Sequence, residues 1–296
     1  RNIMNNSTKI LKQNRLAFVY DFDGTLTPQP MQEYTVLPEL GLEAEQFWSE
    51  VDEEKRRTGG DSILTYMRLL IEKIEQKKAH LSRESLRQLA SHIKYYPGVE
   101  SWFDRINKYT EEQSRGTVET KHYIVSAGLG EILEGVSIKK FFQKIYASEY
   151  YFDHHEVARF PTTVINDTAK TQYLFRINKG LEETSENINL FMPESDRPIP
   201  FRNMLYIGDG LTDVPSMTVV KNYGGYAIAV HKSGDKKAVE VCQQLLNANR
   251  IDFFTNADYS PNSKLEHLIK KVINLMIARI DFEKEKTAFY LNNLNE

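Results

Sequence analysis

Cysteine is almost absent from this chain, since Cys242 is the only one among its 296 residues. An internal disulfide bond or a cysteine-rich metal site is therefore excluded, and the composition fits a reducing compartment. Long apolar runs are missing too: none approaches the roughly 18 to 20 residues that span a bilayer, and residues 1–14 are polar. We expect a cytoplasmic protein with no membrane partner. Because the chain begins at Arg1 rather than methionine, we also expect residues to have been trimmed or added there, and an upstream targeting segment stays open.

A strong excess of one charge is absent as well. Lysine and arginine number 38 and aspartate and glutamate 41, which gives a net charge of −3. This balance argues against a protein that binds nucleic acid through its overall charge. Any affinity for phosphate must therefore come from a few residues gathered in one place. The length allows one large core or a core with a smaller domain, and we favour the second.

The stretch from Leu16 to Thr27 is the most informative part of the sequence. Apolar residues lead directly into Asp21 and Asp23, and the pattern breaks at Gly24, which predicts a buried strand that ends in a tight loop. Open α/β sheets bind their ligands at this end of a strand. Two neighbouring carboxylates repel each other unless a cation or a shared proton relieves them, and Mg2+ suits carboxylate oxygens. The alternative is an ordinary solvated turn, because Asp-Gly is common in turns.

The segments after this loop predict an inserted helical region followed by an α/β pattern. Residues 32–96 show no strand-like alternation and contain three helix-forming stretches, 42–54, 63–77 and 83–95. Beyond them, the apolar patterns predict strands over 122–125, 144–148, 204–207, 225–230 and 250–254, an exposed hairpin over 150–165, and a long amphipathic helix over 263–291.

This order of elements predicts the fold class and the domains. We expect an α/β protein with a Rossmann-like parallel sheet, helices on both faces and an inserted helical cap. Residues 1–27 and 97–296 would form the core domain, and residues 28–96 the cap domain. A helical insertion directly after a catalytic loop is well placed to exclude water and to select the substrate, although it could also serve packing alone.

The two aspartates of the first loop are suited to phosphoryl transfer. Asp21 supplies a carboxylate nucleophile that can form an aspartyl-phosphate, which divides one difficult displacement into two easier ones. Asp23 can protonate the leaving oxygen and later activate water.

Three further segments supply the other groups that this chemistry needs. Ser126 and Ala127 follow the second predicted strand and offer a hydroxyl and backbone N–H groups to phosphate oxygens. Lys170 stands at a predicted helix start, where its charge adds to amides that already favour anions. Asp209 and Asp213 follow the fourth strand and complete a cation site, where Mg2+ would neutralise phosphate and nucleophile together.

These motifs resemble the signatures of the haloacid dehalogenase superfamily of phosphohydrolases. The first signature matches DFDGT at residues 21–25, the second matches Ile124–Gly128, and the fourth matches Gly208–Asp213. The third signature is a single lysine. Lys170 is preferred for it because a turn of small residues precedes this lysine, and Lys179 is the fallback.

The resemblance implies a role for each aspartate. Asp21 would be the nucleophile and a metal ligand, and Asp23 the acid and base with its backbone carbonyl on the metal. Asp209 would be the third protein ligand, supported by Asp213. Superfamily members that cleave carbon–halogen bonds generally lack the second aspartate, so Asp23 argues against dehalogenation.

The position of the helical insertion resembles the phosphoserine-phosphatase-like branch of the superfamily. That branch carries an acidic residue near the cap linker that holds the substrate amine, and Glu33 is the candidate here, at an offset from Asp21 that leaves phosphoserine specificity open. The predicted function is a Mg2+-dependent phosphomonoesterase that acts through an aspartyl-phosphate on a small phosphorylated metabolite. The alternatives are a phosphotransferase or phosphonate-cleaving relative on the same core, or a catalytically silent binding scaffold.

Overall fold

A seven-stranded sheet forms the centre of the protein, whose computed structural model describes residues 12–293. The strand order is β4-β3-β2-β1-β5-β6-β7, and all neighbours are parallel except β3 and β4. The strands are β1 Arg15–Tyr20, β2 Glu119–Leu129, β3 Phe142–Phe152, β4 Ala158–Thr163, β5 Met204–Gly208, β6 Tyr226–His231 and β7 Phe253–Asn256. The predicted α/β fold with a parallel sheet is confirmed, and β1, which leads into Asp21, is its central strand.

The helices fall into those of the insertion and those that cover the sheet. The insertion contains α2 Met31–Tyr34, α3 Val36–Glu39, α4 Ala44–Thr58, α5 Ser62–Gln76 and α6 Arg83–Leu89. The others are α7 Val99–Ser114, α8 Gly130–Leu133, α9 Lys170–Lys179, α10 Val214–Asn222, α11 Lys236–Asn247 and α12 Lys264–Asn293. Short 3-10 turns lie at Ala90–His92, Lys139–Phe141, Glu194–Asp196, Phe201–Asn203 and Leu211–Asp213.

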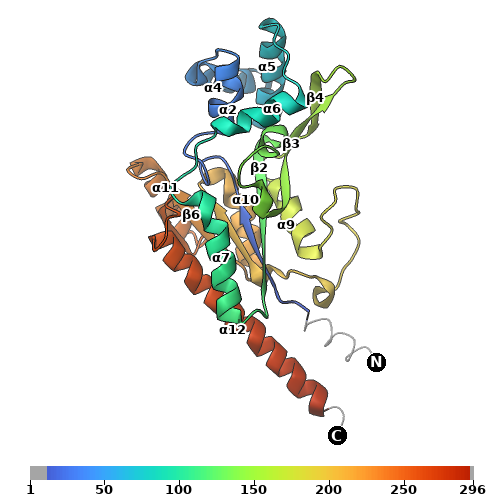
Figure 1. The fold of residues 1–296 in the computed structure, drawn as a ribbon, viewed down its shortest axis with the longest axis vertical. Coiled ribbons are helices and arrows are strands. Elements are labelled where there is room, and N and C mark those ends of the chain that lie inside the picture. The colour runs from blue at the N-terminus through green and yellow to red at the C-terminus, as the bar shows by residue number, and fades with distance from the viewer. Residues whose placement is uncertain (1–11, 294–296) are drawn as a thin grey trace.

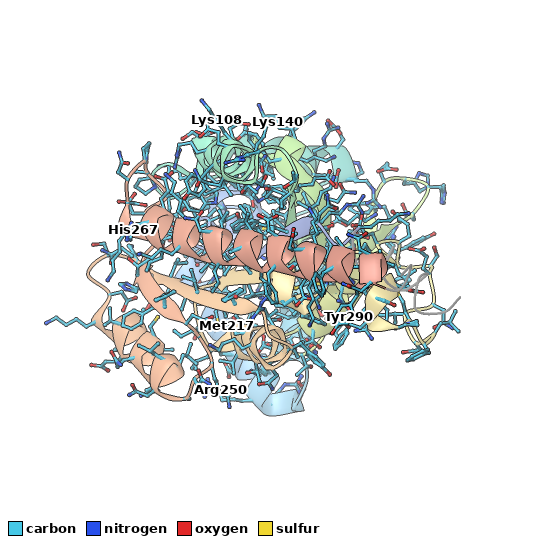
Figure 2. The ribbon with its side chains drawn as sticks, turned by 90° about the horizontal axis from the view of Figure 1, so that it is seen from below. Lys108, Lys140, Met217, Arg250, His267 and Tyr290 are labelled. Atoms are coloured by element: carbon cyan, nitrogen blue, oxygen red, sulfur yellow. The ribbon has the colours of Figure 1, made fainter. Side chains whose placement is uncertain are left out.

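Helices cover both faces of the sheet, because successive side chains of a strand point to opposite sides. Leu16, Phe18 and Tyr20 of β1 belong to an apolar cluster with α7 and α12. Ala17 and Val19 belong to a second cluster with α9, α10 and α11. Figure 2 shows α12 crossing the underside of the molecule from His267 towards Tyr290. Residues 16–20 of β1 are buried on both faces, so the predicted two-sided covering is confirmed.

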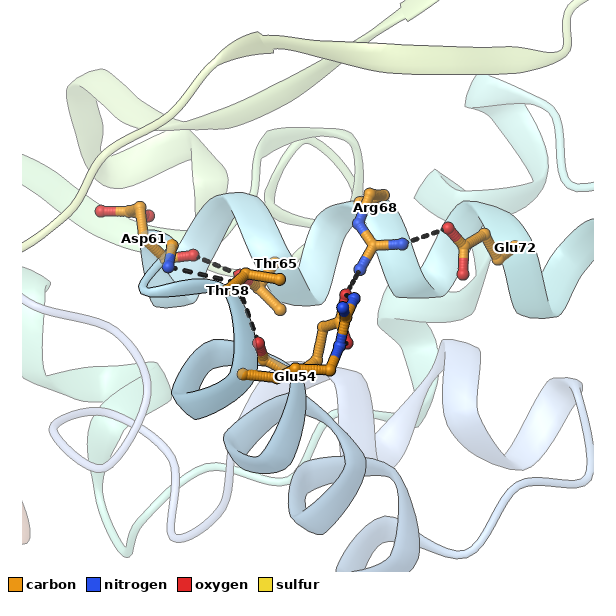
Figure 3. Close-up of polar contacts among 8 residues, drawn as sticks. Glu54, Thr58, Asp61, Thr65, Arg68 and Glu72 are labelled. Carbon is orange, nitrogen blue, oxygen red and sulfur yellow. Dashed lines mark hydrogen bonds and ion pairs between the residues drawn. The ribbon is translucent and has the colours of Figure 1, made fainter.

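The helical insertion lies between β1 and α7 in the chain and above the sheet in Figure 1. Helices α4 and α5 form a hairpin that is tied by an ion pair from Arg68 of α5 to Glu54 of α4, and Arg68 also pairs with Glu72 within α5 (Figure 3). Asp61 caps α5 and Ser82 caps α6 through side-chain oxygens, as predicted for Ser82. The division into a core domain and a cap domain stays a prediction, and the predicted polar lead-in before residue 12 lies outside the described residues.

The strand expected over 250–254 is β7, which runs from Phe253 to Asn256, and two further predicted boundaries were wrong. Residues 126–128 were expected in a loop, but β2 continues through them to Leu129, with an irregular register to β3 after Val125. The helix expected over 83–95 ends as α6 at Leu89 and a 3-10 turn at His92. The following chain is extended because the Tyr96 N–H bonds to the Leu26 carbonyl, next to the first loop. Tertiary contacts therefore overrode local propensity at both places. Among residues 12–293, no helix has the length and apolar character needed to traverse a bilayer.

Candidate active site

Asp21 stands immediately after the central strand, where the sheet fixes its backbone. Its N–H donates to the carbonyl of Ile207 in β5 at 3.0 Å, so the chain is still held by the neighbouring strand. Its carboxylate is 7% exposed and faces Lys170. The Thr25 hydroxyl donates to the second carboxylate oxygen at 3.4 Å. The fold thus presents one buried carboxylate at the carboxyl edge of the sheet.

Lys170, the first residue of α9, brings a buried positive charge to the same place. Its Nζ lies 2.9 Å from Asp21 Oδ1 and 2.8 Å from Asp213 Oδ1, and its side chain is 2% exposed. Burial alone would lower the pKa of this lysine, but the two carboxylates raise it well above its ordinary value. Lys170 is therefore a charged ammonium group held between two acids.

Asp213 and Asp209 approach Asp21 from the segment after β5. Asp213 is fully buried: its Oδ1 also accepts from the Tyr206 hydroxyl at 2.6 Å, and its Oδ2 accepts from the Asp209 N–H at 3.1 Å. Gly24, with φ +79°, makes room for Asp209, because a Cβ atom at this position would lie 2.0 Å from Asp209 Oδ2. The glycine of the first motif is thus required by both its backbone conformation and its neighbour.

The donor set of this cluster fits a hard divalent cation. Carboxylate oxygens of Asp21, Asp209 and Asp213 all lie within 4.8 Å of one another. Three carboxylates face one ammonium group, so burial and mutual repulsion raise the pKa of Asp209 well above normal. Burial, moderated by Lys170, raises the pKa of Asp21 to about 6. An oxygen-liganded cation such as Mg2+ would relieve this excess of negative charge.

Asp23 points away from that cluster and towards the helical insertion. Its Oδ1 accepts a hydrogen bond from the Met31 N–H at 2.7 Å, and its Oδ2 lies beside Gly128 of β2. Burial, followed by repulsion from Asp21, raises the pKa of Asp23 to about 8. A carboxyl group with this pKa is protonated at neutral pH and can donate a proton.

Ser126 and Ala127 lie on β2, beside β1. Ser126 is fully buried, and its Oγ accepts from the Gly128 N–H at 2.9 Å. The carbonyl of Ala127 accepts from the hydroxyl of Tyr66 in α5 at 3.0 Å. These two residues lie towards the carboxyl end of β2, and the insertion contacts Ala127 directly.

The other candidate residues are engaged elsewhere. Lys179 Nζ donates to the carbonyls of Ile188 and Leu190, so the structure brings Lys170 rather than Lys179 to Asp21. Glu33 Oε1 accepts from Trp48 Nε1 at 2.9 Å within the insertion, and its charge contributes to the raised pKa of Asp23.

Several residues that shape the site were missed in the sequence. Tyr206 reads only as an apolar strand residue, yet its hydroxyl holds Asp213. Tyr66 and Met31 lie in the insertion, and their contacts to Ala127 of β2 and to Asp23 depend on the fold. Asn166 had a usable signal, since it is a capping residue type ahead of the helix that begins at Lys170.

Comparisons with known proteins bear on the fold. No protein-family model matches the sequence. An uncharacterized protein of Borreliella burgdorferi strain B31 is 28% identical over 296 residues, covering 90% of this chain and 99% of its own. A HAD family hydrolase of Salmonella enterica serovar Typhi superposes with a TM-score of 0.56 at 16% identity, over 83% of this chain and 68% of that one. The chain has the haloacid dehalogenase-like hydrolase fold.

Two further solved structures with this fold are phosphoserine phosphatases by name. A substrate-bound phosphoserine phosphatase complex gives a TM-score of 0.53 at 16% identity, over 87% of this chain and 98% of that one. A probable phosphoserine phosphatase of Vibrio cholerae gives 0.54 at 11% identity, over 92% and 68%. Because the superposition covers 92% of this chain, it includes at least part of the insertion as well as the sheet.

Proposed function

We propose that this protein is a Mg2+-dependent phosphomonoester hydrolase that acts through an aspartyl-phosphate on a small phosphorylated metabolite. The observation that carries the proposal is the position of Lys170, whose ammonium group lies between Asp21 and Asp213. A buried carboxylate, a buried ammonium group and a cluster of carboxylate oxygens meet at one point, which is the arrangement that phosphoryl transfer needs. The structural neighbours that are phosphatases by name give further support.

The first half of the reaction would use both aspartates of the first loop. An oxygen of Asp21 attacks phosphorus in line with the ester oxygen, so that the new O–P bond forms as the ester P–O bond breaks. Asp23, protonated at neutral pH, gives its proton to the departing alkoxide. The products of this half are the free alcohol and phosphorylated Asp21.

The second half restores the enzyme. Asp23, now a carboxylate, takes a proton from water as the water oxygen attacks phosphorus, and the bond to Asp21 breaks. Lys170 and the Ser126 segment would hold the equatorial phosphoryl oxygens in both halves. Asp21, the Asp23 backbone carbonyl and Asp209 would hold Mg2+, which would offset the charge that accumulates between phosphate and carboxylate.

The wider setting also belongs to this proposal. We place the enzyme in the cytosol, with a small phosphorylated substrate and with neither nucleic acid nor a membrane as its partner. The cap domain, residues 28–96, would choose the leaving group, because the Met31 N–H donates to Asp23 and the charge of Glu33 contributes to the raised pKa of Asp23. A phosphotransferase would carry out the same first half of the reaction, but an acceptor other than water would take the phosphoryl group in the second half. A catalytically silent scaffold would carry out neither half.

A screen of phosphorylated metabolites tests the proposal. Each compound is incubated with wild-type protein and Mg2+, and released phosphate is measured against the Asp21→Asn protein as blank. The proposal expects release from at least one monoester and none above background with the variant. Equal release by both proteins, or release by neither across the panel, would reject it.

A further inference from the structure

The helical insertion makes a polar contact to the segment that presents Lys170. Asp61, at the start of α5, accepts a hydrogen bond on Oδ2 from Asn166 Nδ2 at 2.9 Å. Asn166 lies four residues before Lys170, in the turn that leads into α9. This contact joins residues 105 positions apart, and it adds to the contacts that the insertion makes with Asp23 and Ala127.

The side chain of Asn166 has a fixed orientation. Its Oδ1 accepts from the Ala169 N–H at 2.9 Å and from the Thr168 hydroxyl at 3.2 Å. Its backbone carbonyl accepts from the Lys170 N–H at 3.1 Å. Because the oxygen of the amide is committed to the turn, the NH2 group must face Asp61. One side chain therefore both builds the turn at Lys170 and bonds to the insertion.

Asp61 is equally committed on its own side. Its Oδ1 accepts from the N–H groups of Ile63 and Leu64 at 2.8 and 3.0 Å, and its carbonyl accepts from the Thr65 hydroxyl at 2.6 Å. Figure 3 shows it at the turn between α4 and α5, where the ion pair from Arg68 to Glu54 braces the same hairpin. A shift of this hairpin would therefore carry the Asp61 carboxylate with it.

We propose that Asn166 is a positioning residue through which the helical insertion holds Lys170 in place between Asp21 and Asp213. This rests on the proposed function only for the role of Lys170 in catalysis. If the insertion merely selected substrates, breaking the contact would change KM for large substrates alone. If it holds Lys170, breaking the contact lowers kcat on every substrate, including a small aryl phosphate that scarcely reaches the insertion.

A reciprocal exchange tests this pairing. In Asn166→Asp, the carboxylate at position 166 faces the carboxylate of Asp61, but an oxygen is kept as the acceptor for the Ala169 N–H. In Asp61→Asn, the NH2 group at position 61 faces the NH2 group of Asn166, but an oxygen is kept that caps α5. The double variant, Asp61→Asn with Asn166→Asp, recreates a donor and an acceptor with the direction reversed. Asp52→Asn, a change of an exposed charge in α4 of the same helical hairpin, is the matched control.

We expect each single variant to lower kcat on p-nitrophenyl phosphate by about tenfold, with the double variant within about twofold of wild type. The control should match wild type. Unchanged kcat in both single variants would overturn the proposal, as would a double variant whose loss equals the product of the two single losses.

Hydrogen exchange supplies a readout that does not depend on activity. Both single variants should speed exchange of the amides in the first turn of α9, at Lys170 and the residues after it, and the double variant should restore slow exchange. If the wild type hydrolyses no phosphate ester, the proposed function fails while this measurement still decides the coupling. Unaltered exchange at α9 in both single variants would reject the coupling itself.

Discussion

Lys170 Nζ lies 2.9 Å from Asp21 Oδ1, although the two residues are 149 positions apart in the chain. The same ammonium group bonds to Asp213, and the side chains of all three residues are buried. Such a buried pair is costly to assemble, because each ion loses its hydration, and it is costlier still to break from one side. We therefore expect the site to depend on Lys170 for stability as well as for the proposed binding of phosphate.

Matched replacements of Lys170 and Lys179 should show which of the two lysines belongs to the site. Lys170→Met leaves Asp21 and Asp213 facing each other without a counter-charge, so unfolding without metal should be easier by about 3–5 kcal/mol. Lys179→Met removes contacts to two loop carbonyls only and should cost about 1 kcal/mol. Urea unfolding and aryl phosphate turnover measure both effects. A larger loss of turnover from the Lys179 variant would contradict the assignment.

Removal of divalent metal should abolish turnover, and added Mg2+ should restore it. The metal should also stabilise the fold, by about 2.7 kcal/mol at a concentration 100 times its Kd, because it binds a carboxylate cluster that exists only in the folded chain. Thermal unfolding with and without Mg2+ measures this. Asp209→Asn is the control and should respond little. Full turnover after chelation would rule out the cation site.

Gly24→Ala should impair the metal site more than a comparable glycine change elsewhere. A Cβ atom at position 24 would meet Asp209 Oδ2, whereas a Cβ atom at position 41, where Gly41 also has a positive φ of +63°, would have no such atom within 4 Å. Both substitutions should destabilise the protein by about 1–2 kcal/mol, because alanine is strained in a left-handed backbone conformation. Any further difference between the two variants therefore reports the displacement of the Asp209 carboxylate. We expect the Mg2+ concentration for half-maximal activity to rise sharply for Gly24→Ala only. Equal values for both variants would show that Gly24 has only a conformational role.

The raised pKa of Glu131 should make the free energy of unfolding depend on pH. This buried carboxylate of α8 accepts from the Tyr150 N–H, and burial raises its pKa to about 7. The folded protein then holds a proton that the unfolded chain has lost, so Glu131 makes the wild type less stable as pH rises from about 4.5 to about 7. Glu131→Gln removes this cost and should gain up to about 3 kcal/mol above pH 7, with no gain below pH 4.5.

Urea unfolding of both proteins at several pH values tests this difference. Arg83→Gln, which removes the only cation within 4.0 Å of Glu131 among the described residues, is the companion variant. A gain for Glu131→Gln that stays constant from pH 4 to 8 would contradict an ionisation effect.

Most residues of the candidate site could be predicted from the sequence, because they follow directly after the predicted strands. Asp21, Asp23 and Gly24 follow a short run of apolar residues that ends in turn residues, which is typical of a buried strand in an α/β chain. Asp209 and Asp213 follow a second run of the same kind. Parallel strands place their carboxyl ends along one edge, so the meeting of these loops was predictable without coordinates.

The parts that were not predictable depend on contacts between distant segments. Nothing near Tyr96 indicates that its N–H pairs with Leu26, which is why the third helix of the insertion was extended too far. The run of β2 past Ser126 depends on its neighbours, and Tyr206 becomes a polar partner only because Asp213 folds back over β5. Local patterns cannot report such pairings.

The covalent intermediate on Asp21 tests the central claim most directly. Wild-type protein with Mg2+ and a substrate found in the metabolite screen is quenched with acid during turnover, and its peptides are analysed by mass spectrometry. The account predicts one added phosphoryl group on the peptide that contains Asp21, absent from the Asp21→Asn protein. Rapid turnover with no phosphorylated Asp21, or a phosphoryl group on another residue, would contradict it.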